Sequence, residues 1–313
     1  MEEIKGYARG WFVVAYSSEI GLGEVLRMQY FGQEMVAWRG EDGTVRILDA
    51  HCPHLGAHLG VGGCVKGNDI VCPFHAWKFD GVGTCVEIPY ASRIPKQARL
   101  KSWTLMERNG LVFVWFDPED GAPDFDIPLL DGYGTPGWSA WEPNILRIAT
   151  HPREVIENIA DKAHFPTVHG TVVDVFENEF TDHIAIQRTA GIAYPRGGGT
   201  DTFSLTATYY GPAYMITEMD GVLPSKMLVA HTPIDENSLH LRFGVILPKV
   251  ADDEKMAGFI KAYADNLLIG FREDIQIWEN KCYRVRPRLV AEDGPLGRMR
   301  IWYRQFYTPR LGA

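Results

Sequence analysis

Two cysteines and two histidines stand at a regular spacing in the first quarter of the chain. His54 follows Cys52 at the second position, and His75 follows Cys72 at the third, with seventeen residues between His54 and Cys72. Each half offers one thiolate and one imidazole from a short segment that proline stiffens, and both groups are ligands of transition metals. The spacing therefore predicts a metal site built from two loops.

Two kinds of metal centre use two cysteines and two histidines. A zinc site of this composition usually takes both cysteines from one half of the motif and both histidines from the other. A Rieske [2Fe-2S] cluster holds one iron by two cysteines and the other iron by two histidines. Here each half mixes the two residue types, as expected for two loops that clamp a cluster from opposite sides, so the order favours the iron–sulfur cluster over zinc.

A second group of possible ligands lies near the middle of the chain. Asp161, His164 and His169 follow one another in a segment that we expect to be helical over residues 151–165. Asp161 and His164 would share a helix face, and Pro166 would end or kink the helix so that His169 returns beside His164. Two histidines provide two positions of a 2-His-1-carboxylate triad, which leaves sites on Fe(II) open for O2 and substrate. Asp161 is a possible third ligand or a surface acid.

The remaining carboxylate could come from the C-terminal part of the chain. Glu273, Asp274 and Glu279 lie on a predicted long helix. Phe271, Asp274 and Trp278 share one face of that helix, whereas Glu273 points about 100° away. An acid on an aromatic stripe is poorly explained by solvation, so the pattern favours Asp274 without excluding the other two.

The elements expected to position these residues change in character along the chain. Residues 11–16, 35–50 and 102–116 predict strands and hairpins, with turns at Asp42-Gly43 and Asn109-Gly110. They indicate an all-β module that ends near Asp117, followed by a linker rich in proline, aspartate and glycine.

The rest of the chain predicts an α+β domain. We expect strands over residues 181–248, interrupted by a glycine-rich loop at 195–201. A long helix is expected over residues 251–282, capped by Asp252 or Asp253. The chain is therefore predicted to be a β module followed by an α+β domain.

Composition and charge limit the partners and the compartment. The 313 residues carry a formal net charge of -9, and no long basic stripe is present, so nucleic acid is not expected as a partner. The longest apolar run, at 111–116, is far too short for membrane insertion, and the N-terminus does not resemble a signal peptide. We expect a cytoplasmic protein. An odd total of five cysteines argues against a disulfide framework, and Cys64, Cys85 and Cys282 are expected to be inert thiols.

The cysteine and histidine motifs carry a resemblance to a known family. The stretches "CPH" and "CPFHAWKFDGVG" resemble the Rieske domains of ring-hydroxylating oxygenases. Ala57 and Phe74 stand where respiratory Rieske proteins have a disulfide, and Trp77 and Phe79 stand where those proteins have hydroxyl groups near the cluster. Because such hydrogen bonds raise the reduction potential, we predict a value at the low end of the Rieske range, roughly -150 mV.

The resemblance implies a fold and a set of cofactors. It implies an all-β Rieske domain at 1–117 and a helix-grip (START-like) catalytic domain at 118–313, with an antiparallel sheet and a long C-terminal helix. It implies one Rieske cluster and one mononuclear Fe(II) per chain. In the family, the iron ligands correspond to His164, His169 and Asp274.

The resemblance also implies a path for electrons. It assigns to Asp161 a hydrogen-bonded bridge between His164 and the cluster ligand His75 of a neighbouring subunit, in a homotrimer. The chain lacks the G-x-G-x-x-G motif and the plant-type ferredoxin cysteine spacing. A separate NAD(P)H-dependent reductase or ferredoxin is therefore expected as the partner.

Longer segments narrow the resemblance. Residues 88–118, 153–165 and 291–307 resemble the oxygenase components of 3-ketosteroid 9α-hydroxylases, in which positions matching Phe271 and Trp278 line the substrate pocket. This implies the terminal oxygenase of a multicomponent Rieske monooxygenase, which uses O2 to hydroxylate an apolar, polycyclic, steroid-like substrate. The alternatives are ring hydroxylation or O-/N-demethylation of a smaller aromatic, sterol desaturation, or electron transfer without oxygenase activity.

Overall fold

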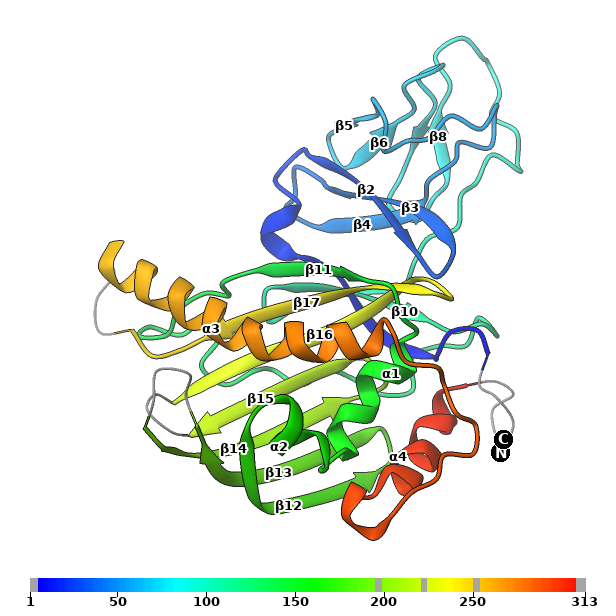
Figure 1. The fold of residues 1–313 in the computed structure, drawn as a ribbon. Coiled ribbons are helices and arrows are strands. Elements are labelled where there is room, and N and C mark those ends of the chain that lie inside the picture. Colours follow the sequence, from blue (N-terminus) through cyan, green and yellow to red (C-terminus); the bar gives the residue numbers. More distant parts are fainter. Residues whose placement is uncertain (1–4, 195–198, 221–223, 250–253, 308–313) are drawn as a thin grey trace. The chain divides into compact units, whose positions relative to one another are not determined.

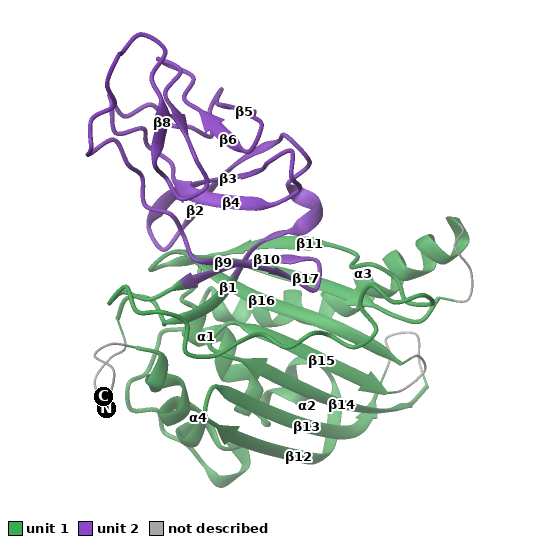
Figure 2. Ribbon diagram, turned by 180° about the vertical axis from the view of Figure 1, so that it is seen from behind, with its two compact units in different colours: residues 1–12, 116–313 green, residues 13–115 purple. Residues whose placement is uncertain are grey.

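The computed structural model describes residues 5–194, 199–220, 224–249 and 254–307 (Figure 1). The chain forms two units (Figure 2). We call residues 13–115 the small unit, and residues 1–12 with 116–313 the large unit.

The small unit is built from short antiparallel strands in three sheets, ordered β1-β10-β9, β2-β3-β4 and β5-β6-β7-β8, although residues 10–12 of β1 and Phe116 of β10 belong to the large unit. The elements are β1 Gly10–Tyr16, η1 Ser17–Glu19, β2 Val25–Tyr30, β3 Gln33–Arg39, β4 Val45–Asp49, β5 Cys64–Lys66, β6 Asp69–Val71, β7 Lys78–Phe79, β8 Cys85–Glu87, β9 Leu105–Arg108 and β10 Leu111–Phe116. The predicted hairpin at Asn109-Gly110 is present, because Leu111 pairs with Arg108. The expectation of an all-β N-terminal domain is confirmed.

The large unit contains one antiparallel sheet of seven strands in the order β11-β17-β16-β15-β14-β13-β12. Its strands are β11 Asn144–Ile148, β12 Thr171–Thr181, β13 Ile184–Ala193, β14 Asp201–Tyr210, β15 Tyr214–Asp220, β16 Ser225–Asp235 and β17 Ser238–Ile246. All neighbours except β11 and β17 are consecutive in sequence, so the sheet is a meander with β11 added at one edge.

Helices cover one face of this sheet (Figure 1). The helical elements are α1 Pro152–Ile156, η2 Glu157–Ala160, α2 His164–Val168, α3 Glu254–Trp278, η3 Ala291–Asp293, α4 Leu296–Tyr303 and η4 Arg304–Phe306. The buried face of α3, with Ala264, Leu268 and Trp278, packs against strand residues such as Val229 and Phe243. The antiparallel sheet and the long C-terminal helix confirm the predicted α+β catalytic fold.

The expected continuous helix over residues 151–165 is wrong. The chain leaves the helical conformation at Asp161, which has φ -91° and ψ 103°, and a separate short helix, α2, begins at His164. Pro166 does not end a helix, because it lies in the first turn of α2, where a missing N–H breaks no helical bond. Asp161 and His164 therefore do not share a helix face.

Two hydrogen bonds explain the break before α2. The Asp161 carboxylate accepts the backbone N–H of His164 at 3.3 Å, which replaces a helical partner by a local cap. The backbone N–H of Lys162 donates to the carbonyl of Asp293 at 2.8 Å, so a distant segment takes the bond that a continuous helix would need. The second bond could not be foreseen from the local sequence.

Two element boundaries also differ from expectation. The continuous run of strands begins at Thr171 and not near 181, because β12 is an edge strand whose polar residues obscure its alternation. One strand of the sheet, β11, lies still earlier at Asn144–Ile148 and was not expected. Helix α3 ends at Trp278 and not at 282. The expected caps Asp252 and Asp253 lie outside the described residues.

The remaining features of the fold concern its helices and its cysteines. No helix among the described residues is both long and apolar enough to cross a bilayer. All five cysteines are free.

Candidate metal centres and substrate cavity

The two Cys–His segments of the small unit form loops with the same hydrogen-bond pattern. In the first loop the Cys52 N–H donates to the Ala57 carbonyl at 2.9 Å, and the Gly56 N–H donates to the Cys52 carbonyl at 2.9 Å. In the second loop the Cys72 N–H donates to the Trp77 carbonyl at 2.8 Å, and the Ala76 N–H donates to the Cys72 carbonyl at 3.1 Å.

The fifth residue of each loop adopts a positive φ, 79° at Gly56 and 56° at Ala76. Such values favour glycine, and the strain at Ala76 indicates that the loop shape is imposed by its surroundings. The second loop is closed by the pairing of Val71 with Lys78 between β6 and β7.

Side chains of the same type from the two loops lie next to each other, cysteine beside cysteine and histidine beside histidine. The thiols of Cys52 and Cys72 are both buried and close enough to influence each other electrostatically. The imidazole rings of His54 and His75 lie 4.6 Å apart, centroid to centroid, and the Trp77 ring stacks on His54 at 4.7 Å. Two thiols on one side and two imidazoles on the other is the donor arrangement of a Rieske cluster.

The chemistry of these donors fits a positively charged centre. Burial, together with the neighbouring Cys72, raises the pKa of the Cys52 thiol to about 11. The His75 Nδ1 atom is buried and has no hydrogen-bond partner among the described residues. Bound iron would stabilise the thiolates and occupy imidazole nitrogens, and both effects offset the cost of burying these groups.

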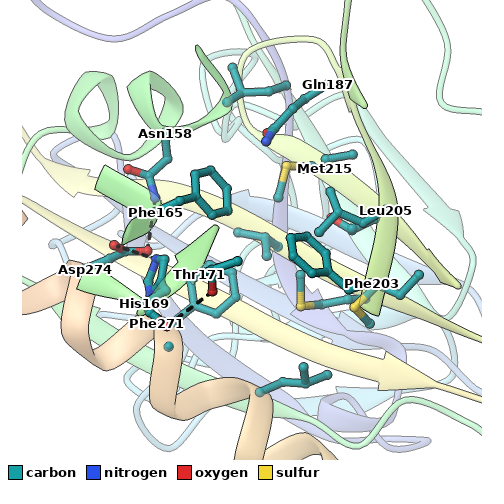
Figure 3. A pocket seen from close by; sticks show the side chains of 18 of the residues that line it. Asn158, Phe165, His169, Thr171, Gln187, Phe203, Leu205, Met215, Phe271 and Asp274 are labelled. Atoms are coloured by element: carbon teal, nitrogen blue, oxygen red, sulfur yellow. Dashed lines mark hydrogen bonds and ion pairs between the residues drawn. The ribbon is translucent and has the colours of Figure 1, made fainter. Parts of the chain in front are cut away.

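The second set of donors meets in the large unit. One ligand atom each from His164, His169 and Asp274 lies within 4.8 Å of the others. His169 Nε2 lies 3.4 Å from Asp274 Oδ1, and the two histidine rings are 5.1 Å apart and nearly perpendicular. The histidines come from α2 and the residue after it, and the carboxylate comes from α3. Figure 3 shows His169 beside Asp274. Two imidazoles and a carboxylate on one side of an open space form the donor set of a mononuclear iron site.

Asn158 positions the carboxylate of this set and was missed by sequence reasoning. Its Nδ2 donates to Asp274 Oδ2 at 3.0 Å, which leaves Oδ1 directed at His169. Asp274 is only 6% exposed, so this hydrogen bond also satisfies a buried oxygen. The two residues are 116 positions apart, and no local pattern singles out Asn158.

The other two acids of α3 have different roles. Glu273 Oε2 lies 3.4 Å from His169 Nδ1, although helical geometry turns Glu273 away from Asp274. A carboxylate on the outer nitrogen of a metal-binding histidine orients the ring. Burial lowers the pKa of His169, but Asp274 and Glu273 outweigh burial and raise it. Glu279 accepts the backbone N–H of Ala149 at 2.9 Å, outside the donor set.

Asp161 lies beside His164 despite the break in the helix. Its Oδ1 is 3.6 Å from His164 Nδ1, and its side chain remains 34% exposed. Burial raises the pKa of Asp161, but the hydrogen bonds and charge of His164 outweigh burial and hold that pKa below its usual value. Asp161 is therefore an ionised, partly exposed acid in contact with a candidate ligand.

A cavity of about 460 Å³ extends from this donor set between the helices and the sheet. Phe271 and Trp278 line it, with the phenyl ring of Phe271 packed 5.3 Å from that of Phe243. Most of the lining is apolar, and no lysine or arginine of the described chain contributes to it. The lining residues are Val155, Asn158, Ile159, His164, Phe165, His169, Thr171, Gln187, Ala193, Asp201, Thr202, Phe203, Ser204, Leu205, Ala207, Tyr209, Met215, Thr217, Met219, Asp220, Met227, Val229, Tyr263, Leu267, Gly270, Phe271, Asp274 and Trp278.

Known families match both units. Residues 10–103 match the Rieske [2Fe-2S] domain, and residues 114–307 match the 3-ketosteroid 9α-hydroxylase C-terminal domain. A probable 3-ketosteroid-9-alpha-monooxygenase, oxygenase component, of Rhodococcus rhodochrous is 38% identical over 323 residues, covering 96% of this chain and 80% of that protein. A cholesterol 7-desaturase of Ciona intestinalis is 32% identical over 339 residues, covering 97% of this chain and 70% of that protein.

Solved structures show the same fold. The crystal structure of dicamba monooxygenase bound to dicamba has a TM-score of 0.80 at 21% identity and covers 96% of this chain and 97% of that one. With the donor sets of both units and the sequence relatives, the chain therefore belongs to the Rieske oxygenases, in the family of the 3-ketosteroid 9α-monooxygenase oxygenase components, and is an oxidoreductase with a Rieske [2Fe-2S] domain.

Proposed function

We propose that this oxygenase component hydroxylates a neutral, apolar, polycyclic substrate of steroid type. The observation that carries the proposal is the large apolar cavity with His164, His169 and Asp274 at its wall. Its volume lies in the range of cavities that enclose small-molecule ligands, and its aromatic side chains suit a flat substrate. The oxygenase components of 3-ketosteroid-9-alpha-monooxygenases among the relatives support the same substrate class.

The charge of the cavity favours this class over aromatic acids. A carboxylate taken out of water needs a cationic or strongly hydrogen-bonding partner. The described lining contains no lysine or arginine, and Asp201, Asp220 and Asp274 would repel an anion. A neutral substrate is the better fit to this lining.

Desaturation of a sterol is the second candidate reaction. The similarity to a cholesterol 7-desaturase supports it. The same cavity and donor set would serve both reactions, and the products differ in mass. Hydroxylation adds one oxygen atom, whereas desaturation removes two hydrogens.

The roles of the chain's residues follow from their placement. His164, His169 and Asp274 would hold the mononuclear iron, and Cys52, His54, Cys72 and His75 would hold the cluster. When bound, the two centres supply electron transfer and O2 activation. Asn158 and Glu273 orient the iron ligands, and the apolar walls around Phe271 and Trp278 hold the substrate and exclude water.

We further propose how electrons reach the large unit. The oxygenase component requires a separate component that supplies electrons, and we propose an NAD(P)H-dependent reductase or ferredoxin. Asp161, ionised and partly exposed beside His164, would bridge to His75 of a neighbouring subunit in a homotrimer. Residues 1–117 would form the electron-accepting domain and 118–313 the catalytic domain. A cytoplasmic location fits the five cysteines, because two would hold the cluster and none forms a disulfide.

The proposal is tested with purified protein, a surrogate reductase, NADH and a panel of neutral steroids and aromatic acids, with product mass as the measurement. We expect oxygenated products from steroids and none from the acids. Asp274→Ala should abolish product formation and mononuclear iron binding while the visible spectrum of the Rieske cluster remains. Product formation by D274A at the wild-type rate, or turnover of the acids alone, would contradict the proposal.

A further inference from the structure

A buried amide stands on the cavity-facing side of the sheet. Gln187 on β13 is cross-strand neighbour of Ala207 on β14, which in turn pairs with Thr217 on β15. All three line the cavity, and Gln187 is only 5% exposed. Because Ala207 is small, the longer Gln187 side chain has room to extend over Ala207 towards the cavity. Figure 3 shows its amide turned into the cavity.

The protein satisfies only part of the hydrogen-bonding capacity of the Gln187 side-chain amide. Gln187 Nε2 donates to Thr189 Oγ1 at 2.7 Å, which fixes the plane of the amide. This is the one hydrogen bond that the Gln187 side chain makes within the described chain, so its Oε1 and its second N–H have no protein partner there. A buried amide with unmet hydrogen bonds costs free energy unless a ligand or water completes them.

The surroundings of Gln187 make such a polar group unusual. Leu205, Met215, Met219, Met227 and Phe203 line the same cavity from the neighbouring strands. An apolar cavity with a small number of placed polar groups is the arrangement by which proteins fix the orientation of a neutral ligand.

The amide and the iron-type donors come from different layers. Gln187 belongs to the sheet, whereas His164, His169 and Asp274 belong to the helical segments that cover it. Figure 3 shows Gln187, His169 and Asp274 around the cavity. A substrate in the cavity can therefore touch both at once. A single hydrogen bond, added to apolar contacts, limits which carbon faces the donor set, because the flat ring system can no longer slide or turn over freely.

We propose that the Gln187 amide, held by Thr189, binds a ketone or hydroxyl oxygen of the substrate and sets which C–H bond faces the iron site. This inference rests on the proposed function and narrows its substrate class to neutral polycycles with one hydrogen-bonding oxygen. The amide can donate through its N–H to a ketone or accept through Oε1 from a hydroxyl group.

The test uses three matched probes, 5α-androstane, 5α-androstan-3-one and 5α-androstan-17-one, with the iron-loaded protein and its Gln187→Met variant. Equilibrium dialysis with mass detection measures Kd for each probe. Without a partner, a buried carbonyl weakens binding, so a ketone should bind more weakly than the hydrocarbon. In the wild type we expect one ketone to bind at least as tightly as 5α-androstane, and in Q187M the same ketone to lose about tenfold in affinity relative to 5α-androstane.

The outcomes separate this inference from the proposed function. If both ketones bind the wild type at least tenfold more weakly than 5α-androstane, the inference is wrong and the apolar cavity still stands; this comparison does not depend on the variant. An unchanged affinity ratio in Q187M also overturns it. If no probe binds the wild type, the proposed substrate class fails as well. A second readout is the set of hydroxylated positions, which should broaden in Q187M.

Discussion

Asp274 shows how one residue of the site depends on neighbours that are remote in sequence. Its carboxylate is nearly enclosed, and each oxygen has a different task, with Oδ2 bonded to Asn158 and Oδ1 facing His169. His169 is held in turn by Glu273 on its outer nitrogen. Such outer contacts lower the freedom of the ligands before any metal arrives, so the site is organised in advance.

His231 is a different kind of buried residue. It is fully enclosed on β16, and neither ring nitrogen has a hydrogen-bond partner among the described residues. Burial, with a smaller effect from His151, lowers its pKa to about 3. A ring that stays neutral and packs against Tyr209 has a structural role in the interior of the sheet.

The buried state of His231 predicts a pH-dependent stability. Between the ordinary histidine pKa of about 6.5 and the folded value, the unfolded chain binds a proton that the folded chain does not. Stability should therefore fall as the pH drops below about 6.5, by roughly 2 kcal/mol at pH 5. Urea unfolding of the wild type and of His231→Leu, each at pH 7.5 and pH 5, measures this loss of unfolding free energy. The loss on acidification should be smaller in H231L by about this amount, and equal losses in both proteins would contradict the assignment.

At the scale of elements, buried charges hold the segment α1–η2 in place. Glu157 accepts from Arg300 Nε at 2.6 Å and lies 3.3 Å from Lys281, and Lys281 lies 2.8 Å from Glu154. Arg300 belongs to α4, and Lys281 follows α3. The same segment carries Asn158 and leads to Asp161, so the C-terminal part of the chain fixes the position of residues at the proposed iron site.

The ion pair between Arg300 and Glu157 predicts a large effect when only one partner is removed. Arg300→Met leaves the Glu157 carboxylate buried without its main partner and should cost about 3 kcal/mol of unfolding free energy. The double variant R300M/E157Q should be less destabilised, because no uncompensated charge remains. Thermal unfolding of the wild type, R300M, E157Q and the double variant, with mononuclear iron content as a second measurement, checks this. A double variant as unstable as the sum of the single changes would show that the pair is not coupled.

At the scale of the whole molecule, the chain separates its two redox centres between two units. The cluster-type donors lie in the small unit, and the iron-type donors lie in the large unit. Asp161 keeps a third of its side chain exposed beside His164. If electrons cross between subunits, the functional unit is an assembly and not the single chain.

Mixed assemblies can test this directly. Asp161→Ala chains keep the cluster but lack the bridge, and His75→Ala chains keep the bridge but lack an intact cluster. Each variant alone should be nearly inactive. In the proposed trimers, formed from equal amounts of both, about a quarter of the iron sites would pair an intact cluster with an intact bridge, so product formation should recover to about a quarter of the wild-type level. No recovery in trimers of verified mixed composition would contradict transfer between subunits.

The sequence by itself determined the candidate donors and the fold class, because these depend on local spacing. Cys52 with His54, Cys72 with His75, and His164 with His169 each lie on one short segment, and the stripe of Phe271, Asp274 and Trp278 lies on one helix. The alternation of the strands and the amphipathic pattern of the long helix likewise appear in neighbouring residues.

Only the tertiary structure decided what surrounds those donors. The break at Asp161 depends on a bond from Lys162 to Asp293, and Asn158 meets Asp274 across 116 positions. Gln187 is one of many polar strand residues until the sheet and α3 enclose it in an apolar cavity. Contacts between distant segments leave no periodic trace in the sequence, because each partner obeys only its own local pattern. The donors could therefore be found along the chain, and the groups that orient them and the substrate could not.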